Sequence, residues 1–91
     1  MPSTLAAEVA ALDAARKAAA GGDPDATLSL LDRYRYDFPD GELAADAEVV
    51  AIEAFAAKGD RAAVAQRVAR FLALHPNDPH AAAVRRLARG R

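Results

Sequence analysis

Two histidines near the C-terminal end are the residues most readily interpreted as metal ligands. His75 and His80 flank Pro76, and Asp78 lies between them. Structural zinc sites usually use four protein ligands and catalytic sites three, so this short cluster is a weak metal signal. We favour a structural interpretation in which His75 replaces the aromatic residue found at Phe38 and His80 lies in the first turn of a helix. No metal and no cofactor is expected.

Three carboxylates, Asp46, Glu48 and Glu53, fall on one predicted helix and could be interpreted as acid–base pairs. A solvated helix face explains them equally well. The serines and threonines lack an accompanying base motif. The glycine pair Gly21-Gly22 lacks the Lys-Ser/Thr that follows in a phosphate-binding loop. We therefore expect that the protein is not an enzyme.

Composition indicates one small all-helical domain covering residues 1–91. Hydrophobic residues make up 53% of the chain, but many are alanine, which favours helix and buries little area. There are no cysteines, which excludes disulfides and thiolate metal sites. No apolar run approaches the roughly 18 residues of a membrane span, and no signal peptide is recognised, so membrane insertion is not expected.

The net charge of −1 conceals an asymmetry. Residues 21–60 carry ten acidic and three basic side chains, whereas residues 61–91 carry seven arginines and one aspartate. One interpretation is a pair of solvated faces that attract each other within the fold. The other is a basic C-terminal part that binds an acidic partner or phosphates. We favour the first, because no aromatic or Gly-rich element lies between the arginines.

A segment of the chain occurs twice, 37 residues apart. Gly22-Asp23 returns as Gly59-Asp60, Tyr34 returns as Phe71, and Phe38-Pro39 returns as His75-Pro76. Each copy begins with a helix breaker and cap and ends with an aromatic residue or His before proline. A fixed period of about 20–50 residues is typical of stacked-repeat architectures.

These signals predict five helices, over residues 4–20, 24–38, 41–57, 61–74 and 78–89. Asp23-Pro24 is a strong helix start, Asp40 is expected to cap the third helix, and Asn77 or Asp78 the fifth. The expected core stripe of the first helix is Leu5, Val9, Leu12, Ala15 and Ala19. The third helix carries two apolar stripes and is expected at the centre of the fold, and the fifth is expected to cap the stack.

The repeated pattern resembles the second helix of a tetratricopeptide repeat, of the kind found in bacterial outer-membrane assembly lipoproteins and the Tol–Pal coordinating protein. The resemblance covers residues 5 to 89. It implies a five-helix antiparallel stack: repeat one over 5–40, repeat two over 41–77, and a capping helix over 78–89. The period of 37 differs from the family's usual length of about 34, and Thr27 and Val64 stand where the family has a small alanine.

The family binds peptides or helices in a groove lined by the first helix of each repeat. Carried over to this chain, the resemblance implies a groove lined by helices one, three and five. Its partner-binding residues would be Leu12, Arg16, Asp46, Val49, Glu53 and Arg86. The Lys and Asn that hold a C-terminal carboxylate in some members are absent from the matching positions, so such a ligand is not expected.

The leading hypothesis is a non-catalytic protein–protein interaction module of a bacterial regulatory or envelope protein. The alternative is self-association into a homodimer or stacked array, because the core is alanine-rich and the two halves differ in charge. A distant third is phosphate or nucleic-acid binding through five arginines, Arg67, Arg70, Arg85, Arg86 and Arg89. The compartment stays open: bacterial cytoplasm, or periplasm if the chain is part of a larger envelope protein.

Overall fold

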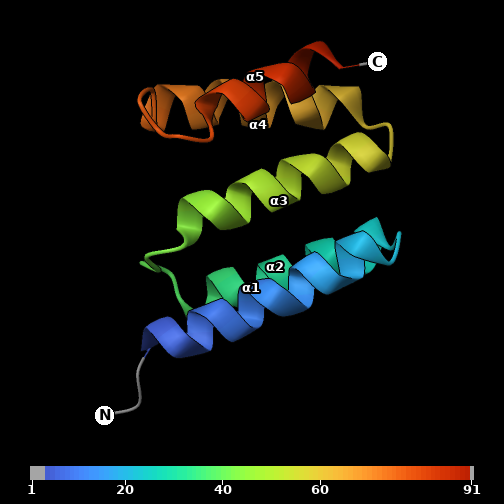
Figure 1. The fold of residues 1–91 in the computed structure, drawn as a ribbon. Helices are drawn as coiled ribbons and strands as arrows, with labels where there is room; N and C mark the ends of the chain where they lie inside the picture. Colours follow the sequence, from blue (N-terminus) through green and yellow to red (C-terminus); the bar gives the residue numbers. More distant parts are fainter. Residues whose placement is uncertain (1–3, 91) are drawn as a thin grey trace.

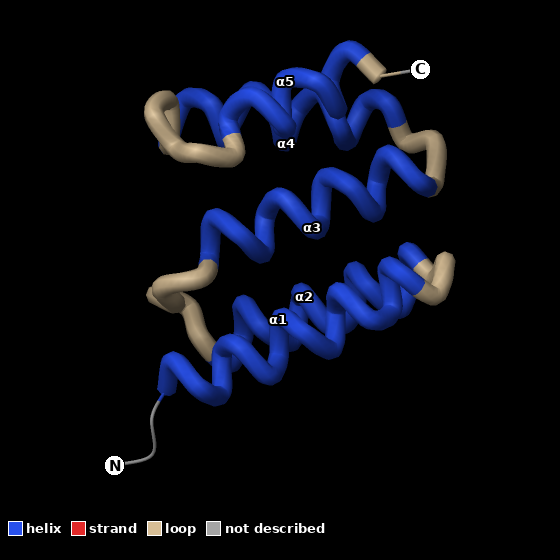
Figure 2. The backbone as a smooth tube through the Cα atoms, viewed as in Figure 1, coloured by secondary structure: helices blue, strands red, loops and turns tan. Residues whose placement is uncertain are grey.

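The computed structural model describes residues 4–90 and contains five α-helices (Figures 1 and 2). They are α1 Thr4–Ala20, α2 Pro24–Asp37, α3 Ala44–Ala57, α4 Arg61–Leu74 and α5 Ala81–Arg89. Each helix packs antiparallel against the next, and no strand occurs in the described part of the chain. The predicted all-α, five-helix antiparallel arrangement is confirmed.

Helix α3 lies at the centre and joins two helical pairs. It contacts all four other helices, with the α1–α2 pair on one side and the α4–α5 pair on the other (Figure 1). Across residues 4–90, the backbones of α2 and α4 do not contact each other, and α1 does not contact α5. The two halves of the molecule are therefore held together mainly through α3, as the two apolar stripes of this helix predict.

The repeated Gly-Asp pair builds the same turn twice. Gly22 and Gly59 have φ angles of 78° and 76°, which glycine adopts without a steric cost. The backbone N–H of the following aspartate donates to the carbonyl five residues earlier at 3.0 Å, which closes a Schellman motif. Each aspartate then caps the next helix: Asp23 and Asp60 accept from the amide three residues further on, at 3.0 and 3.1 Å.

The aromatic end of the repeat is also built twice. The backbone N–H groups of Phe38 and His75 donate to the carbonyls of Tyr34 and Phe71 at 2.8 Å in both copies. The ring centroids of Tyr34 and Phe38 are 5.4 Å apart, and those of Phe71 and His75 are 5.1 Å apart. His75 thus takes the place of Phe38 in the second copy, as the spacing predicts.

The core consists of two apolar clusters on opposite sides of α3. Buried residues of the first come from α1, α2 and α3, and those of the second from α3, α4 and α5. The first contains Leu12, Ala15, Leu31, Tyr34, Ala47, Val50 and Ala51. The second contains Val49, Ile52, Val64, Val68, Phe71 and Val84. Burial of these side chains is the main term that stabilises the stack.

The predicted core stripe of α1 is only partly correct. Leu12 and Ala15 are buried, but Leu5 and Val9 are 43% and 44% exposed, and Ala19 is exposed. The stripe begins instead at Glu8, which is only 3% exposed. A buried carboxylate is tolerated here because its Oε1 accepts hydrogen bonds from the Tyr34 hydroxyl at 2.7 Å and the Leu43 N–H at 3.1 Å.

The same network explains why α3 begins three residues later than predicted. Asp40 does not cap this helix; Leu43 occupies the N-cap position and forms no side-chain cap. Its N–H is held by Glu8 of α1, so the connection from α2 stays non-helical until Ala44. Helix α5 also starts late, at Ala81. His80 rather than Asn77 or Asp78 holds its N-cap position, because the Asp78 carboxylate accepts from the His80 N–H at 2.8 Å in a tight local turn.

Candidate functional site

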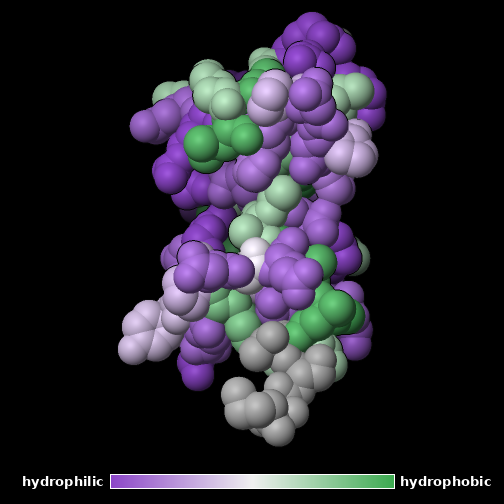
Figure 3. Space-filling view, turned by 90° about the vertical axis from the view of Figure 1, so that its left-hand side faces the viewer, coloured by the Kyte–Doolittle hydropathy of each residue, from purple (hydrophilic) through white to green (hydrophobic). Residues whose placement is uncertain are grey.

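A hollow of about 580 Å³ forms a groove between α2 and α4. We call it the α2–α4 groove. It exists because these two helices do not touch, so α3 is exposed between them as a floor. Small Ala44 and the side chain of Glu48 form that floor. In the space-filling view, the molecule narrows at the level between the two helical pairs (Figure 3).

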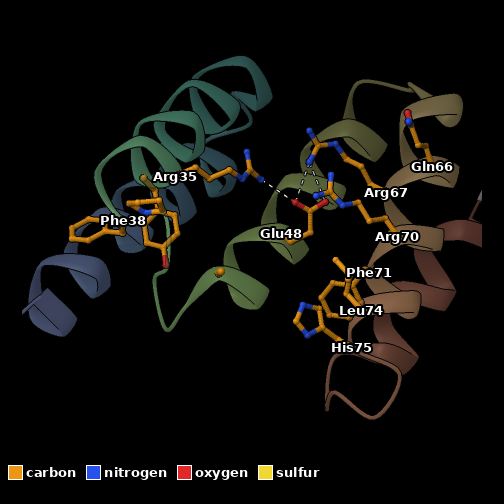
Figure 4. A pocket seen from close by; sticks show the side chains of 12 residues that line it. Arg35, Phe38, Glu48, Gln66, Arg67, Arg70, Phe71, Leu74 and His75 are labelled. Atoms are coloured by element: carbon orange, nitrogen blue, oxygen red, sulfur yellow. Dashed lines mark hydrogen bonds and ion pairs between the residues drawn. The ribbon is translucent and has the colours of Figure 1, made fainter.

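One half of the groove is charged. Glu48 lies between the walls and accepts from Arg35 of α2 at 3.0 Å through Oε1 (Figure 4). From the other wall, Arg67 Nη1 of α4 lies 3.0 Å from both oxygens of the same carboxylate. The Arg67 guanidinium also stacks 4.8 Å from the ring centroid of Phe55, a cation–π contact that fixes its position.

Arg70 adds a third guanidinium to this half of the groove. It is exposed and lines the groove one turn after Gln66. Within residues 4–90 its side chain forms no hydrogen bond or ion pair. Three arginines and one carboxylate therefore line this half of the groove, and Asp32, which does not line it, lies 3.3 Å from Arg35 Nη1. The groove has an excess of positive charge.

The other half of the groove is aromatic and apolar. Phe38 comes from the end of α2, and Phe71, Leu74 and His75 come from the end of α4 (Figure 4). Leu74 is 63% exposed, although it is a large aliphatic residue. Because the repeated aromatic motif ends both α2 and α4, the same sequence feature supplies apolar side chains to both walls.

The six residues predicted to bind a partner do not form one surface. Leu12 and Val49 lie in the two core clusters, at 2% and 7% exposure. Arg16 is exposed on α1, and Asp46 Oδ1 lies 3.1 Å from His80 Nε2. Glu53 and Arg86 do come together, on the walls of a smaller hollow of about 350 Å³ between α3 and α5.

The sequence offered only an indirect signal for the α2–α4 groove. From sequence, a solvated helix face explains Glu48 as well as an acid–base pair does, and Arg67 and Arg70 enter only as members of a candidate phosphate-binding set. The charge asymmetry indicates attraction between residues 21–60 and 61–91, and one such ion pair is that of Glu48 with Arg67. Arg85, Arg86 and Arg89 are exposed on α5 and do not line the groove.

The titratable groups with shifted pKa values form hydrogen bonds or ion pairs within the fold. The hydrogen bond from Tyr34 holds the pKa of Glu8 below its ordinary value, and burial together with Glu8 raises the pKa of Tyr34 to about 12. The backbone N–H of His80 lowers the pKa of Asp78. The ion pair with Asp25 raises the pKa of Lys58.

The surroundings of His80 and the character of the helices bear on metal binding and on membrane insertion. His80 lies between two carboxylates, with Nδ1 2.8 Å from Asp78 and Nε2 3.1 Å from Asp46. Among residues 4–90, no group of three or more His, Cys, Asp or Glu side chains is placed to hold a metal ion. In that same range, none of the helices combines the length and the apolar character needed to cross a bilayer.

Comparison with known proteins identifies no relative. No protein-family model matches the chain, and neither the curated proteins nor the solved structures searched contain a significant match.

Proposed function

We propose that this protein is a non-catalytic protein-interaction module, built from two tetratricopeptide-like hairpins and a capping helix, that binds a segment of another protein in the α2–α4 groove. The single observation that carries the proposal is the groove itself. Helices α2 and α4, which belong to successive hairpins, do not contact each other, and Ala44 and Glu48 of α3 form the floor between them. A volume of about 580 Å³ lies in the range that accommodates ligands in proteins.

The tetratricopeptide-like assignment is supported by the duplicated turn chemistry. The two Gly-Asp turns have nearly the same glycine φ angle, the same Schellman hydrogen bonds and the same aspartate caps. Stacked two-helix repeats commonly present extended binding surfaces. The family resemblance itself implies the opposite face, with Glu53 and Arg86. We favour the α2–α4 groove because it is larger and combines cationic and aromatic side chains.

The test is a selection from a phage-displayed library of random linear peptides on the immobilised full chain. Affinities of the selected peptides are then measured for two matched variants. Ala44→Trp fills the groove floor, whereas Ala65→Trp adds the same bulk at an exposed position of α4 outside the groove. The proposal predicts that Ala44→Trp weakens binding by at least about tenfold and that Ala65→Trp leaves it unchanged.

Circular dichroism spectra of both variants are compared with that of the unchanged protein, to check that the helical fold is intact. Peptides that bind Ala44→Trp as well as they bind the unchanged protein contradict the groove assignment. If Glu53→Arg or Arg86→Glu abolishes binding of the same peptides, the protein is still an interaction module. Its binding site is then the α1–α3–α5 face implied by the family resemblance.

A second candidate, self-association through α1, is favoured by one observation. Leu5 and Val9 lie one turn apart on α1, and both are more than 40% exposed. Within residues 4–90, α1 packs only against α2 and α3, so these side chains are uncovered. Light scattering over a concentration series tests this candidate. It predicts a dimer that Leu5→Glu converts to a monomer, and a monomer at every concentration contradicts it.

A further inference from the structure

We infer that the segment bound in the α2–α4 groove is acidic and apolar: it places a carboxylate side chain against the arginines and a large aliphatic or aromatic side chain against the ends of α2 and α4. This inference rests on the proposed function, because it names the chemistry of the partner for the same groove. Four observations support it, three from the charged half of the groove and one from the apolar half.

The first observation is the excess of guanidinium groups. Arg35, Arg67 and Arg70 line the groove, and Glu48 is the single carboxylate among its lining residues. Arginine forms its best-defined ion pairs with carboxylates, through parallel N–H donors. A partner carboxylate would therefore be attracted to this half of the groove, and a partner cation would be repelled.

The second observation is the position of Glu48. Guanidinium groups from both walls already converge on this carboxylate, at 3.0 Å from α2 and 3.0 Å from α4. The spacing of the walls thus allows one carboxylate to be held from two sides. Each guanidinium has five N–H donors, so Arg35 and Arg67 keep donors for a second acceptor.

The third observation is Arg70. It lines the groove and, in the part of the chain that the structure describes, has no acidic partner. An incoming carboxylate can pair with Arg70 without displacing an existing ion pair. Arg70 is therefore the residue whose charge should control acidic-peptide affinity most directly.

The fourth observation is the apolar half of the groove. Leu74 is 63% exposed beside Phe71 and His75, and Phe38 lines the groove from the end of α2. Burying a large apolar side chain here removes both its own surface and that of Leu74 from water. Charge and apolar surface lie in one groove, so a segment that carries both features fits better than a purely acidic one.

Nucleic acid fits the same groove less well. Its phosphates would also pair with arginine, but Glu48 lies in the middle of the cationic half and would repel a closely spaced row of phosphates. Phosphate contacts would also leave the exposed apolar surface of Leu74 in water. We therefore commit to an acidic peptide segment and treat phosphate binding as an outcome of the test.

The experiment uses the random-peptide selection on the full chain and scores the composition of the selected peptides. We expect enrichment of Asp or Glu together with Phe, Tyr, Leu or Met relative to the unselected library. Affinities are measured by fluorescence anisotropy at low and high salt for Arg70→Glu, Leu74→Ala and a control, Arg85→Glu. Arg85 is an exposed arginine of α5 that does not line the groove.

Arg70→Glu should weaken binding by at least about tenfold and flatten its salt dependence, because it reverses a charge at the contact. Leu74→Ala should weaken binding at both salt concentrations. Arg85→Glu should change the affinity by less than about twofold, which excludes a general effect of net charge.

The outcomes separate this inference from the proposed function. One outcome is that the selected peptides are neutral or basic, that Ala44→Trp abolishes their binding, and that Arg70→Glu leaves their affinity unchanged. This outcome would overturn the acidic partner and leave the groove as the binding site. Selected peptides that are insensitive to Ala44→Trp would overturn both. Single-stranded DNA that binds in an Arg70-dependent manner while no acidic peptide does would replace the acidic peptide with a phosphate ligand.

Discussion

Arg67 of α4 and Glu48 of α3 form an ion pair in which one guanidinium nitrogen lies 3.0 Å from both carboxylate oxygens. Arg35 reaches the same carboxylate from α2. Because α2 and α4 make no direct backbone contact, this three-residue bridge is the polar link across the groove between them. Glu48 is thus contacted by guanidinium groups from both walls.

Replacing Glu48 with glutamine separates its structural contribution from its effect on binding. Its side chain and those of its two partners are all partly exposed, so solvent screens the ion pairs and Glu48→Gln should lower the free energy of unfolding by at most ~1 kcal/mol. The loss of a negative charge should strengthen acidic-peptide binding. Urea unfolding and anisotropy measure the two effects. Glu53→Gln, on the opposite face of α3, is the control, and weaker binding by Glu48→Gln would contradict the proposed charge complementarity.

Gly41 lies where a side chain would collide with the buried Glu8–Tyr34 pair. A methyl group there would overlap the Tyr34 hydroxyl and the Glu8 carboxylate. Gly41→Ala should therefore lower the free energy of unfolding by about 1–3 kcal/mol, as overpacking of a core does. Gly21→Ala is the matched control, since a methyl there meets only ordinary contacts, the nearest at 3.5 Å. Equal urea midpoints for the two variants would contradict the close packing at Gly41.

Tyr34 should make stability fall in alkaline solution. Its pKa is raised from 10.0 to about 12 in the fold, so folding favours the neutral phenol. The stabilising contribution is fully present below pH 10 and is lost as the pH rises towards about 12, because the unfolded chain ionises first. The difference in unfolding free energy between the unchanged protein and Tyr34→Phe should shrink over this window. A constant difference would contradict the buried hydrogen bond to Glu8.

Asp60 caps a helix and Asp40 does not, so substitutions of these two aspartates should have different effects on stability. Asp60 accepts a hydrogen bond from the Ala63 N–H, so Asp60→Ala should cost about 1 kcal/mol of stability. Asp40 has the sequence context of a cap but does not cap α3. Asp40→Ala should therefore stay within about 0.5 kcal/mol of the unchanged protein. Thermal unfolding compares the two, and a larger loss for Asp40→Ala would place the start of α3 where the sequence predicts it.

The features predicted from sequence are those that local chemistry determines. Gly22 and Gly59, with the aspartate after each, specify a turn and a cap within a few residues, so the helix boundaries around them were predicted correctly. The burial of Glu8 was not predictable, because its hydrogen-bond partners lie 26 and 35 residues away. No residue close to Glu8 in the sequence indicates a hydrogen-bond partner for its carboxylate. Leu5 and Val9, by contrast, have the apolar character and the helical spacing that normally predict burial.

The α2–α4 groove escaped sequence analysis for the same reason. It depends on two helices failing to meet, and on Glu48 pairing with arginines 13 and 19 residues away on opposite walls. No short motif encodes that arrangement. The resemblance to tetratricopeptide repeats directed attention to the other face, where Glu53 and Arg86 do meet but Leu12 and Val49 are buried.

The most direct test of the central claim is a map of amide chemical-shift changes in the isotope-labelled full chain as a selected peptide is titrated in. Binding in the α2–α4 groove predicts changes at Arg35, Arg70 and Leu74 and at the neighbouring amides of α2 and α4. Residues on α5 such as Arg85 should not shift. Changes confined to the face that carries Glu53 and Arg86, with none along α2, would contradict the account.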